Sequence, residues 1–515
     1  IHGRQQDAEA ARLMGPPILA ALLLVPFLTG AASVFARGRR AMEALNLAGF
    51  AAVFGLSVAL AGLVLGGGPV SLWGGFLYAD HLSALVILLT AAVALLCAVY
   101  AVGYLRDEEA GGALAAGGNG SALQQYRWYY SLTPLFVSAM LLVTVANNLG
   151  VMWVAVEATT LASVFLVAFY GKPTSLEAAW KYAIIGGVGL SMALFGTILT
   201  YYSGHALAGS DTLAGLNWSF LAGRAAQLDK TTLRLAFILA LLGYGTKAGL
   251  APMHTWKPDA YGEAPVPAAA ILSTAMLNCA LYALVRFYVL TSRALGPEFP
   301  GGLLLLFGVL SMGISVPFVL IQRNYRRLLA YHTIDHAGIM AVAMGLGGTA
   351  GALALMLHMT FHTVAKSLLF LCAGNVSQHF QTDLFRKIGG GVIRVMPATG
   401  AIFLMAMLAI IGMPPFSLFQ SEFLIVKAGF AGGHHTPSVL FILFGTGVFA
   451  GALLHVGGMV LGPPAPDTGP APWRPWQGAS MLALAAVLVV VGFWLPAPLL
   501  ELIRGAAAVV AGEWP

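Results

Sequence analysis

The sequence predicts an all-α polytopic membrane protein of about fourteen transmembrane helices, with two inverted five-helix repeats that each contain a broken helix. First, 59% of the 515 residues are hydrophobic and only 9% are charged, against about 25% charged residues in a soluble domain. Second, apolar windows of about 18 to 28 residues recur along the chain, each long enough to cross a bilayer as a helix. Third, proline interrupts two of these windows beside an ionisable residue.

The windows divide the chain into four parts. Residues 1–129 contain an N-terminal extension and helices 1–3, at about 16–36, 44–66 and 81–104. Residues 130–291 form the first expected repeat, with helices 4–8 at about 130–146, 149–171, 176–202, 234–252 and 265–291. Residues 302–462 form the second, with helices 9–13 at about 302–322, 328–346, 350–375, 396–428 and 437–462. Residues 463–515 carry helix 14, at about 478–503. Because residues 1–13 are polar and precede Met14, we expect the natural chain to begin there.

The two proline interruptions lie five helices apart. Helix 7 is interrupted at Pro252, a few residues after Lys247, and helix 12 at Pro414 and Pro415, shortly before Glu422. Discontinuous helices in corresponding positions are the sequence pattern of inverted repeats with an ion site near the membrane midplane. Backbone groups freed at such breaks need polar neighbours or water, so each break is expected to line a cavity.

Charge and cysteine usage exclude several kinds of partner and cofactor. The net charge is +6. Fourteen Lys and Arg residues, including Lys257 in a loop, fall on the inner side of the predicted topology, against nine, including Arg286, on the outer side. This asymmetry explains the charge and needs no nucleic-acid partner. This distribution predicts that both termini lie outside, on the side of the membrane away from the cytoplasm. The three cysteines lie in separate spans, and the chain has no phosphate loop, haem-attachment motif or iron–sulfur spacing. We therefore expect no cofactor and no catalytic centre in this chain.

Ionisable residues inside the predicted helices are the candidate functional groups. A lysine within an apolar helix is unfavourable by roughly 2.5 to 3.5 kcal/mol on insertion scales, so Lys247 is expected to be functional. Glu157 in helix 5 and Lys181 in helix 6 precede it, and His254 follows it. Desolvation disfavours the charged form of both Lys247 and Glu157, which favours proton exchange between them.

Helices 10 and 11 add a stripe of histidines. His358, His362 and Lys366 stand at positions i, i+4 and i+8, so they share one helix face over about 12 Å. His332 and His336 repeat the i, i+4 spacing on helix 10. Histidine accepts and releases protons near neutral pH, so this stripe predicts a proton relay.

A family resemblance is carried by LAPMHTWKPDAYGEAPVPAAAIL, RRLLAYHTIDHAGI, HMTFHTVAKSLLFLCAG and the proline-broken span ending in SEFLIV. Over about residues 130–430, the chain resembles the antiporter-like subunits shared by respiratory complex I, Mrp-type cation/proton antiporters and membrane-bound hydrogenases. Within that group, NNLGVMWVAVEATTLASVFLVAFY, SLEAAWKYAII and NCALYALVRFY are most similar to the F subunit of hydrogenase 4.

The resemblance implies roles for individual positions. Glu157 matches the family's helix 5 glutamate and Lys247 its broken-helix lysine, which together form the proton input. Glu422 occupies a broken-helix position that some members fill with lysine, and Asn278 departs from complex I relatives that carry lysine there. The relay residues predicted from position and resemblance together are Glu157, Lys181, Lys247, His254, His336, His358, His362, Lys366 and Glu422. Those assigned either a relay or a structural role are His332, Asn278 and Lys427.

Several of these residues have structural alternatives. Glu157 and Lys181 would form an interhelical ion pair, Lys247 would snorkel to an interface, and Lys366 would face the cytoplasmic lipid interface. The two H-x-x-x-H pairs also have the spacing of zinc ligands. No carboxylate follows the first histidine in the manner of zinc proteases, so we predict no metal.

Three functions remain open. The leading one is a proton-translocating subunit of a redox-driven oxidoreductase or ion-translocating complex. Its expected partners are homologous antiporter-like subunits in the bilayer and a driving module such as a nickel–iron hydrogenase. The second is an Mrp-like Na⁺/H⁺ antiporter subunit, with a related proton-channel variant that energises inorganic-carbon uptake. The third is a structural membrane anchor. A sodium site needs several oxygen ligands together, whereas the predicted interior offers mostly nitrogen groups with isolated acids, which favours protons.

Overall fold

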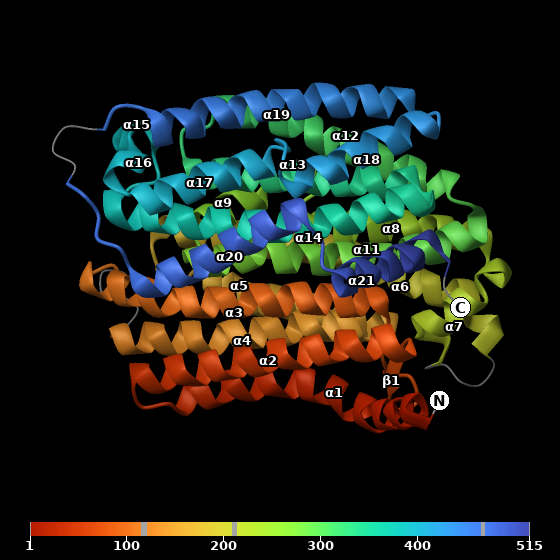
Figure 1. The fold of residues 1–515 in the computed structure, drawn as a ribbon. Coiled ribbons are helices and arrows are strands. Elements are labelled where there is room, and N and C mark those ends of the chain that lie inside the picture. Colours follow the sequence, from red (N-terminus) through yellow and green to blue (C-terminus); the bar gives the residue numbers. More distant parts are fainter. Residues whose placement is uncertain (1, 115–120, 209–213, 465–468, 514–515) are drawn as a thin grey trace.

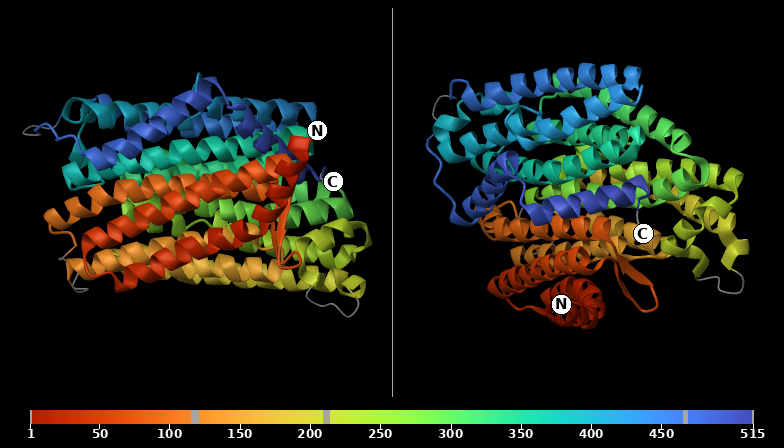
Figure 2. Two further views of the ribbon diagram at one scale, coloured as in Figure 1. Left: turned by 60° about the horizontal axis from the view of Figure 1, so that its bottom comes forward. Right: turned by 45° about the vertical axis from the view of Figure 1, so that its right-hand side comes forward.

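The structure, a computed structural model, describes residues 2–114, 121–208, 214–464 and 469–513. Residue 1 and the side chains of residues 2–16 lie outside this description. The expected start at Met14 falls in this stretch. Long helices run nearly parallel to one another, and both termini lie at the same end of the bundle (Figures 1 and 2). A bundle of helices satisfies every backbone hydrogen bond within each segment, as a bilayer requires.

The described helices can be matched to the predicted spans, except that helix 14, expected at about 478–503, divides into α20 (Pro475–Phe493) and α21 (Ala497–Ala511). Eleven helices are long and apolar enough to cross a membrane. The predicted spans missing from these eleven are helices 7, 10 and 12, which are either rich in charged residues or broken. They correspond to α8 (Lys230–Ala248), α13 (Tyr325–Leu346) and the pair α17 (Pro397–Ile410) and α18 (Ser417–Ala431).

The remaining elements follow in chain order. The helices before α8 are α1 (His2–Phe35), α2 (Arg39–Gly67), α3 (His81–Ala110), α4 (Ala122–Val145), α5 (Leu149–Val167), α6 (Pro173–Ala208) and α7 (Trp218–Gly223), with an antiparallel hairpin of β1 (Val70–Leu72) and β2 (Leu77–Ala79). The short turns η1 (Ala214–Leu216) and η2 (Ala225–Gln227) flank α7. Between α8 and α13 lie α9 (Trp256–Glu263), α10 (Val266–Ile271), the π-helical turn η3 (Leu272–Met276), α11 (Leu277–Leu295) and α12 (Glu298–Ile321). The others are α14 (Gly348–Phe380), α15 (Phe385–Ile388), α16 (Val392–Val395), α19 (His435–Leu461), α20 (Pro475–Phe493) and α21 (Ala497–Ala511).

Both predicted helix breaks are present. The seventh span ends at Ala248 in α8, and the chain turns through residues 249–255 before α9 begins. The twelfth span divides into α17 and α18, with an irregular segment at 411–416 between them. The last residue of α8, Ala248, lies four residues before Pro252. The helix ends there because Gly249 adopts a left-handed conformation (φ 77°).

α14 lies at the centre of the second half. It packs against α3, α10, α13, α17, α18, α20 and α21 (Figure 1). In the first half, α6 and α8 are in close contact because Gly196 and Gly243 have no side chain where the two helices meet. A Cβ at either position would clash with atoms of the other helix. The side chains that project from these helices are therefore held at fixed separations.

A buried ion pair joins α3 to α11. Asp80 caps the N-terminus of α3 by accepting a hydrogen bond from the Ser83 amide, and it receives two bonds from the Arg286 guanidinium, at 2.7 and 2.9 Å. The same guanidinium donates to the Tyr282 hydroxyl and stacks on the Trp218 ring. The sequence-based topology counted Arg286 among basic residues near the outer ends of helices. That assignment is wrong, because Arg286 is 2% exposed and neutralised by Asp80.

Candidate functional site

Lys247 lies in the last turn of α8, immediately before the break, and is 1% exposed. Its Nζ donates to Thr160 Oγ1 of α5 at 2.7 Å and to the Tyr182 hydroxyl of α6 at 2.6 Å. The same nitrogen lies 4.8 Å from the centre of the Tyr182 ring. The alternative that Lys247 snorkels to an interface is therefore wrong, because neutral groups inside the bundle bind its amine.

Glu157 lies on α5 three residues before Thr160, so the two side chains share a face of that helix. Glu157 is half-buried, and its Oε2 has no hydrogen-bond partner among the described residues. Within the described residues, Glu157 and Lys247 do not form an ion pair within 4.0 Å. The carboxylate nevertheless acts electrostatically on the amine. Direct pairing of the two therefore requires one side chain to move toward the other.

Lys181 lies on α6 beside Tyr182 in the sequence but at the surface. Its Nζ forms ion pairs with Glu177 at 2.6 Å and with Asp259 of α9 at 3.2 Å, and the Lys181 side chain is 48% exposed. Arg327 of α13 pairs with the same Asp259. The alternative of a Glu157–Lys181 ion pair is therefore wrong, because the structure gives Lys181 other partners.

The break after α8 is held by hydrogen bonds to its backbone. Trp256 of α9 donates its ring N–H to the Thr246 carbonyl at 3.0 Å, and Ser311 of α12 accepts the Ala251 amide at 2.9 Å. His254 lies inside the break, is 7% exposed and has an Nδ1 without a partner among the described residues. The break is thus a turn held in place by hydrogen bonds, and it carries a histidine whose Nδ1 is available for a further bond.

Lys257 is a buried residue that the sequence interpretation assigned to a loop. It is 0% exposed in the first turn of α9, and its Nζ donates to the Ala248 carbonyl at the end of α8. Counting Lys257 among basic residues at the membrane surface was therefore wrong. A signal was present in the sequence, because Lys257 lies between Trp256 and Pro258, directly after a proline-interrupted apolar helix.

The predicted histidine stripe forms one buried cluster between α13, α14 and α18. His336 Nδ1 lies 2.8 Å from His358 Nε2, and His358 Nδ1 lies 3.0 Å from the Ser421 hydroxyl. The ring centres of His336 and His362 are 5.0 Å apart, and those of His332 and His336 are 6.0 Å apart. Hydrogen bonds thus connect the Ser421 hydroxyl of α18 through His358 of α14 to His336 of α13, and the rings of His332 and His362 lie beside this chain.

Lys366 and Asp335 lie close to the same cluster. Lys366 is 0% exposed, so the alternative that it faces the lipid interface is wrong. Its Nζ and Asp335 Oδ1 have no hydrogen-bond partners among the described residues. Their charges act on each other, and the Lys366 charge also acts on His332, His336 and His362. Unpaired polar atoms at this depth are unfavourable unless water or a transported ion occupies the site.

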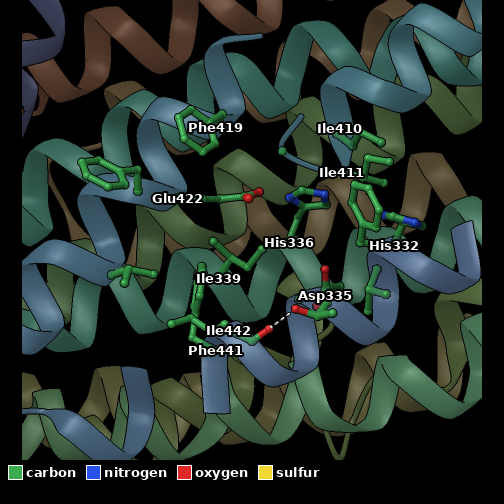
Figure 3. A pocket seen from close by; sticks show the side chains of 17 residues that line it. His332, Asp335, His336, Ile339, Ile410, Ile411, Phe419, Glu422, Phe441 and Ile442 are labelled. Carbon is green, nitrogen blue, oxygen red and sulfur yellow. Dashed lines mark hydrogen bonds between the residues drawn. The ribbon is translucent and has the colours of Figure 1, made fainter. Parts of the chain in front are cut away.

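Glu422 completes the cluster from α18. Figure 3 shows its carboxylate pointing toward the His336 ring across a cavity of about 330 Å³, which Asp335 and His332 also line. The carboxylate of Asp335 acts electrostatically on that of Glu422. The sequence interpretation treated the acids of the interior as isolated, and the structure corrects this by bringing two of them to one cavity.

Two sets of side chains have donor atoms close enough to hold a metal ion. They are His332, Asp335 and His336, and His336, His358 and Glu422, with ligand atoms within 4.8 Å of one another in each set. Both sets also fit the hydrogen-bonded relay, so the expectation of no metal stays a prediction.

The residues given either a relay or a structural role differ in their surroundings. His332 is buried, and both of its ring nitrogens lack partners among the described residues. Asn278 is buried on α11 and donates to Thr363 of α14 at 2.8 Å. Lys427 is exposed near the end of α18. The structure thus brings His332 and Asn278 to the interior and leaves Lys427 at the surface.

Similarity to known proteins identifies the family. The profile described as NADH:quinone oxidoreductase/Mrp antiporter, TM matches residues 146–449. The hydrogenase-4 component F homolog of Methylacidiphilum infernorum (isolate V4) is 38% identical over 358 residues, which are 70% of this chain and 73% of that protein.

Two solved structures share the fold. A chain of the membrane-bound sulfane sulfur reductase, an archaeal respiratory membrane complex, superposes with a TM-score of 0.83 at 23% identity over 96% of this chain and 97% of that one. A chain of respiratory complex I from Thermus thermophilus superposes with a TM-score of 0.72 at 26% identity over 92% of this chain and 96% of that one. The predicted resemblance is confirmed, and the chain belongs to the NADH:quinone oxidoreductase/Mrp antiporter transmembrane family.

Proposed function

We propose that this chain translocates protons within a redox-driven membrane complex and performs no redox chemistry itself. The observation that carries the proposal is Lys247, an amine buried at a helix break, whose hydrogen-bond partners among the described residues are the neutral hydroxyls of Thr160 and Tyr182. A buried amine with neutral partners can exist in both protonation states, because no carboxylate in contact locks the charged form.

The proposed path runs from Glu157 and Lys247 through His254 to the histidine cluster and Glu422. Lys181, in its exposed ion pairs, lies at the entrance. Approach of Glu157 stabilises the protonated Lys247, and withdrawal of Glu157 favours release, because Coulomb attraction inside a protein depends steeply on distance. His362 receives the proton, and His336, His358 and Ser421 pass it toward α18. Glu422 then delivers it to the outer side or to a neighbouring subunit.

The two helix breaks support an internal symmetry. We propose residues 130–291 and 302–462 as inverted repeats, with residues 1–129 and 463–515 as additions at either end. In each repeat the broken helix carries an ionisable residue near its break, Lys247 in α8 and Glu422 in α18. This matches the arrangement in which discontinuous helices surround an ion site.

The partners and the location are part of the same proposal. The relative from Methylacidiphilum infernorum is named a hydrogenase-4 component, and both structural neighbours are chains of respiratory complexes. We infer that homologous membrane subunits pack beside this chain and that a nickel–iron hydrogenase drives it, in a bacterial inner membrane with both termini in the periplasm. The alternative is that this chain is a proton-channel subunit that energises inorganic-carbon uptake.

The decisive test is Lys247→Ala in the assembled complex. Proton pumping per electron transferred is measured in membrane vesicles, and native gels verify assembly. We expect Lys247→Ala to abolish pumping and Glu157→Gln to reduce it severely, while Lys230→Ala, at an exposed lysine of the same helix, leaves it unchanged. Normal pumping by an assembled Lys247→Ala complex would refute the channel and leave a structural anchor as the function.

Sodium/proton antiport is a second candidate, because Asp335 and Glu422 line one cavity. Carboxylate oxygens are the ligands that hard cations prefer. In this case, transport depends on external Na⁺, and both Asp335→Asn and Glu422→Gln abolish that dependence. Transport that is independent of Na⁺ in the wild type excludes this candidate.

A further inference from the structure

Lys257 is a second buried lysine at the break, beyond the residues of the proposed path. Its amine donates to the Ala248 carbonyl and lies 5.8 Å from the ring centres of both Trp256 and Tyr261. Among the described residues, no carboxylate forms an ion pair with Lys257. An ionisable group without a counter-charge inside a membrane bundle indicates a functional site.

The fold leaves space specifically for this side chain. Gly249 follows the carbonyl that Lys257 binds, and a Cβ at Gly249 would overlap the Lys257 side chain. The same glycine has a φ of 77°, which ends α8. The turn after α8 is therefore built around an inserted lysine.

Lys257 also lies between the two groups of buried polar residues, the one around Lys247 and the histidine cluster. The preceding residue, Trp256, stacks on Tyr182 with ring centres 4.6 Å apart, and Tyr182 binds Lys247. On the other side, the charge of Lys257 acts on His254, His362 and Lys366. α9 accordingly packs against both α6 and α13, the helices that carry Tyr182 and the first histidines.

We propose that Lys257 is a proton carrier that connects Lys247 to the histidine cluster, an inference that rests on the proposed function. The neutral Lys257 amine accepts the proton that Lys247 releases by way of His254, and the resulting ammonium passes one proton to a ring nitrogen of His362. Both ring nitrogens of His362 lack partners among the described residues, so one can accept it. Ordered water bridges separations longer than a hydrogen bond.

Electrostatic repulsion couples this carrier to the histidine cluster through Lys366. Lys257 and Lys366 carry like charges that act on each other, so protonation of one favours release from the other. Lys257 thereby supplies a titratable group between the halves of a chain in which position 278 carries an asparagine that binds Thr363.

The test compares Lys257→Met with Lys257→Arg in the assembled complex. Arginine keeps a positive charge and a donor for the Ala248 carbonyl, but it does not release protons at physiological pH. We expect both variants to lower proton pumping per electron at least tenfold, whereas Lys230→Met, at an exposed lysine, leaves it unchanged. A structural role instead predicts that Lys257→Arg pumps normally.

The outcomes separate this inference from the proposed function. Loss of pumping in Lys247→Ala with normal pumping in either assembled Lys257 variant overturns the carrier and leaves the channel intact. Normal pumping in both Lys247→Ala and the Lys257 variants overturns both. If Lys257→Met does not assemble, Lys257→Arg decides, and failure of both to assemble overturns the carrier in favour of a structural role.

Discussion

Replacing Tyr182 by phenylalanine tests how the structure holds the proton on Lys247. The substitution keeps the ring, including its stacking on Trp256 and its face toward the amine. It removes the hydroxyl that accepts from Lys247 Nζ at 2.6 Å and leaves Thr160 Oγ1 as the remaining acceptor. The same hydroxyl also bonds Ser163 Oγ at 2.7 Å and Met276 Sδ at 3.5 Å, so only one of the three lost hydrogen bonds involves the amine.

The size of the effect follows from that bond. A hydrogen bond to a charged group contributes about 1.5–3 kcal/mol. Because about 1.4 kcal/mol corresponds to a tenfold change in an equilibrium constant, Tyr182→Phe should reduce proton binding at Lys247 by roughly 10- to 100-fold. We expect proton pumping per electron to keep its maximal value. It should fall to half of that value at a pH about one to two units lower than in the wild type.

The assay is the pH profile of proton pumping per electron in membrane vesicles, with assembly checked by native gel. Tyr130→Phe is the matched control, since the Tyr130 hydroxyl is buried on α4 and has no hydrogen-bond partner among the described residues. An assembled Tyr182→Phe complex with the wild-type pH profile would refute the reasoning, because Lys247 would then not be the titrating group. A shift in the control would show that hydroxyl loss in general disturbs the bundle.

Two further predictions concern stability and metal binding. Asp80→Asn should lower the free energy of unfolding by about 3–5 kcal/mol, measured by thermal unfolding in detergent, because it leaves Arg286 buried and unpaired. The double variant Asp80→Leu with Arg286→Met should lose less, and equal losses would contradict the ion-pair account. Burial alone raises the pKa of Asp80, but the charge and hydrogen bonds of Arg286 hold that pKa below its ordinary value. The stabilisation is therefore present at neutral pH and lost as the pH falls through the folded-state pKa. His358→Ala should leave the zinc content of the purified complex unchanged by elemental analysis, whereas loss of one zinc per chain would make His336, His358 and Glu422 a metal site.

The sequence predicted those parts of the relay whose residues lie on one helix. His358, His362 and Lys366 lie four residues apart, so their common face follows from helical geometry alone. The two breaks were likewise predictable, because proline and a left-handed glycine end helices by local sterics. Periodicity within one helix, however, does not report which residue of another helix faces it.

Three features of the site depended on such contacts. Tyr182 and Thr160 became visible as partners of Lys247 only when α5, α6 and α8 were placed together. Asp335 and Glu422 looked isolated because 87 positions separate them in the sequence, although they line one cavity. Lys181 was expected among the buried relay residues, but it lies on an exposed part of α6, in ion pairs with Glu177 and Asp259.

The sequence by itself determined the membrane class, the approximate spans, the two broken helices and the family, because hydropathy, proline and short motifs act locally along the chain. Only the tertiary structure decided which ionisable groups are buried, paired or free. Lys257 and Arg286 illustrate the difference, since both were counted as basic residues at the membrane surface. Lys257 instead binds a helix-end carbonyl and has no counter-charge among the described residues, and Arg286 forms an ion pair with Asp80. The physical reason is that the environment of a charge depends on groups distant in sequence, which helix packing brings within hydrogen-bonding range.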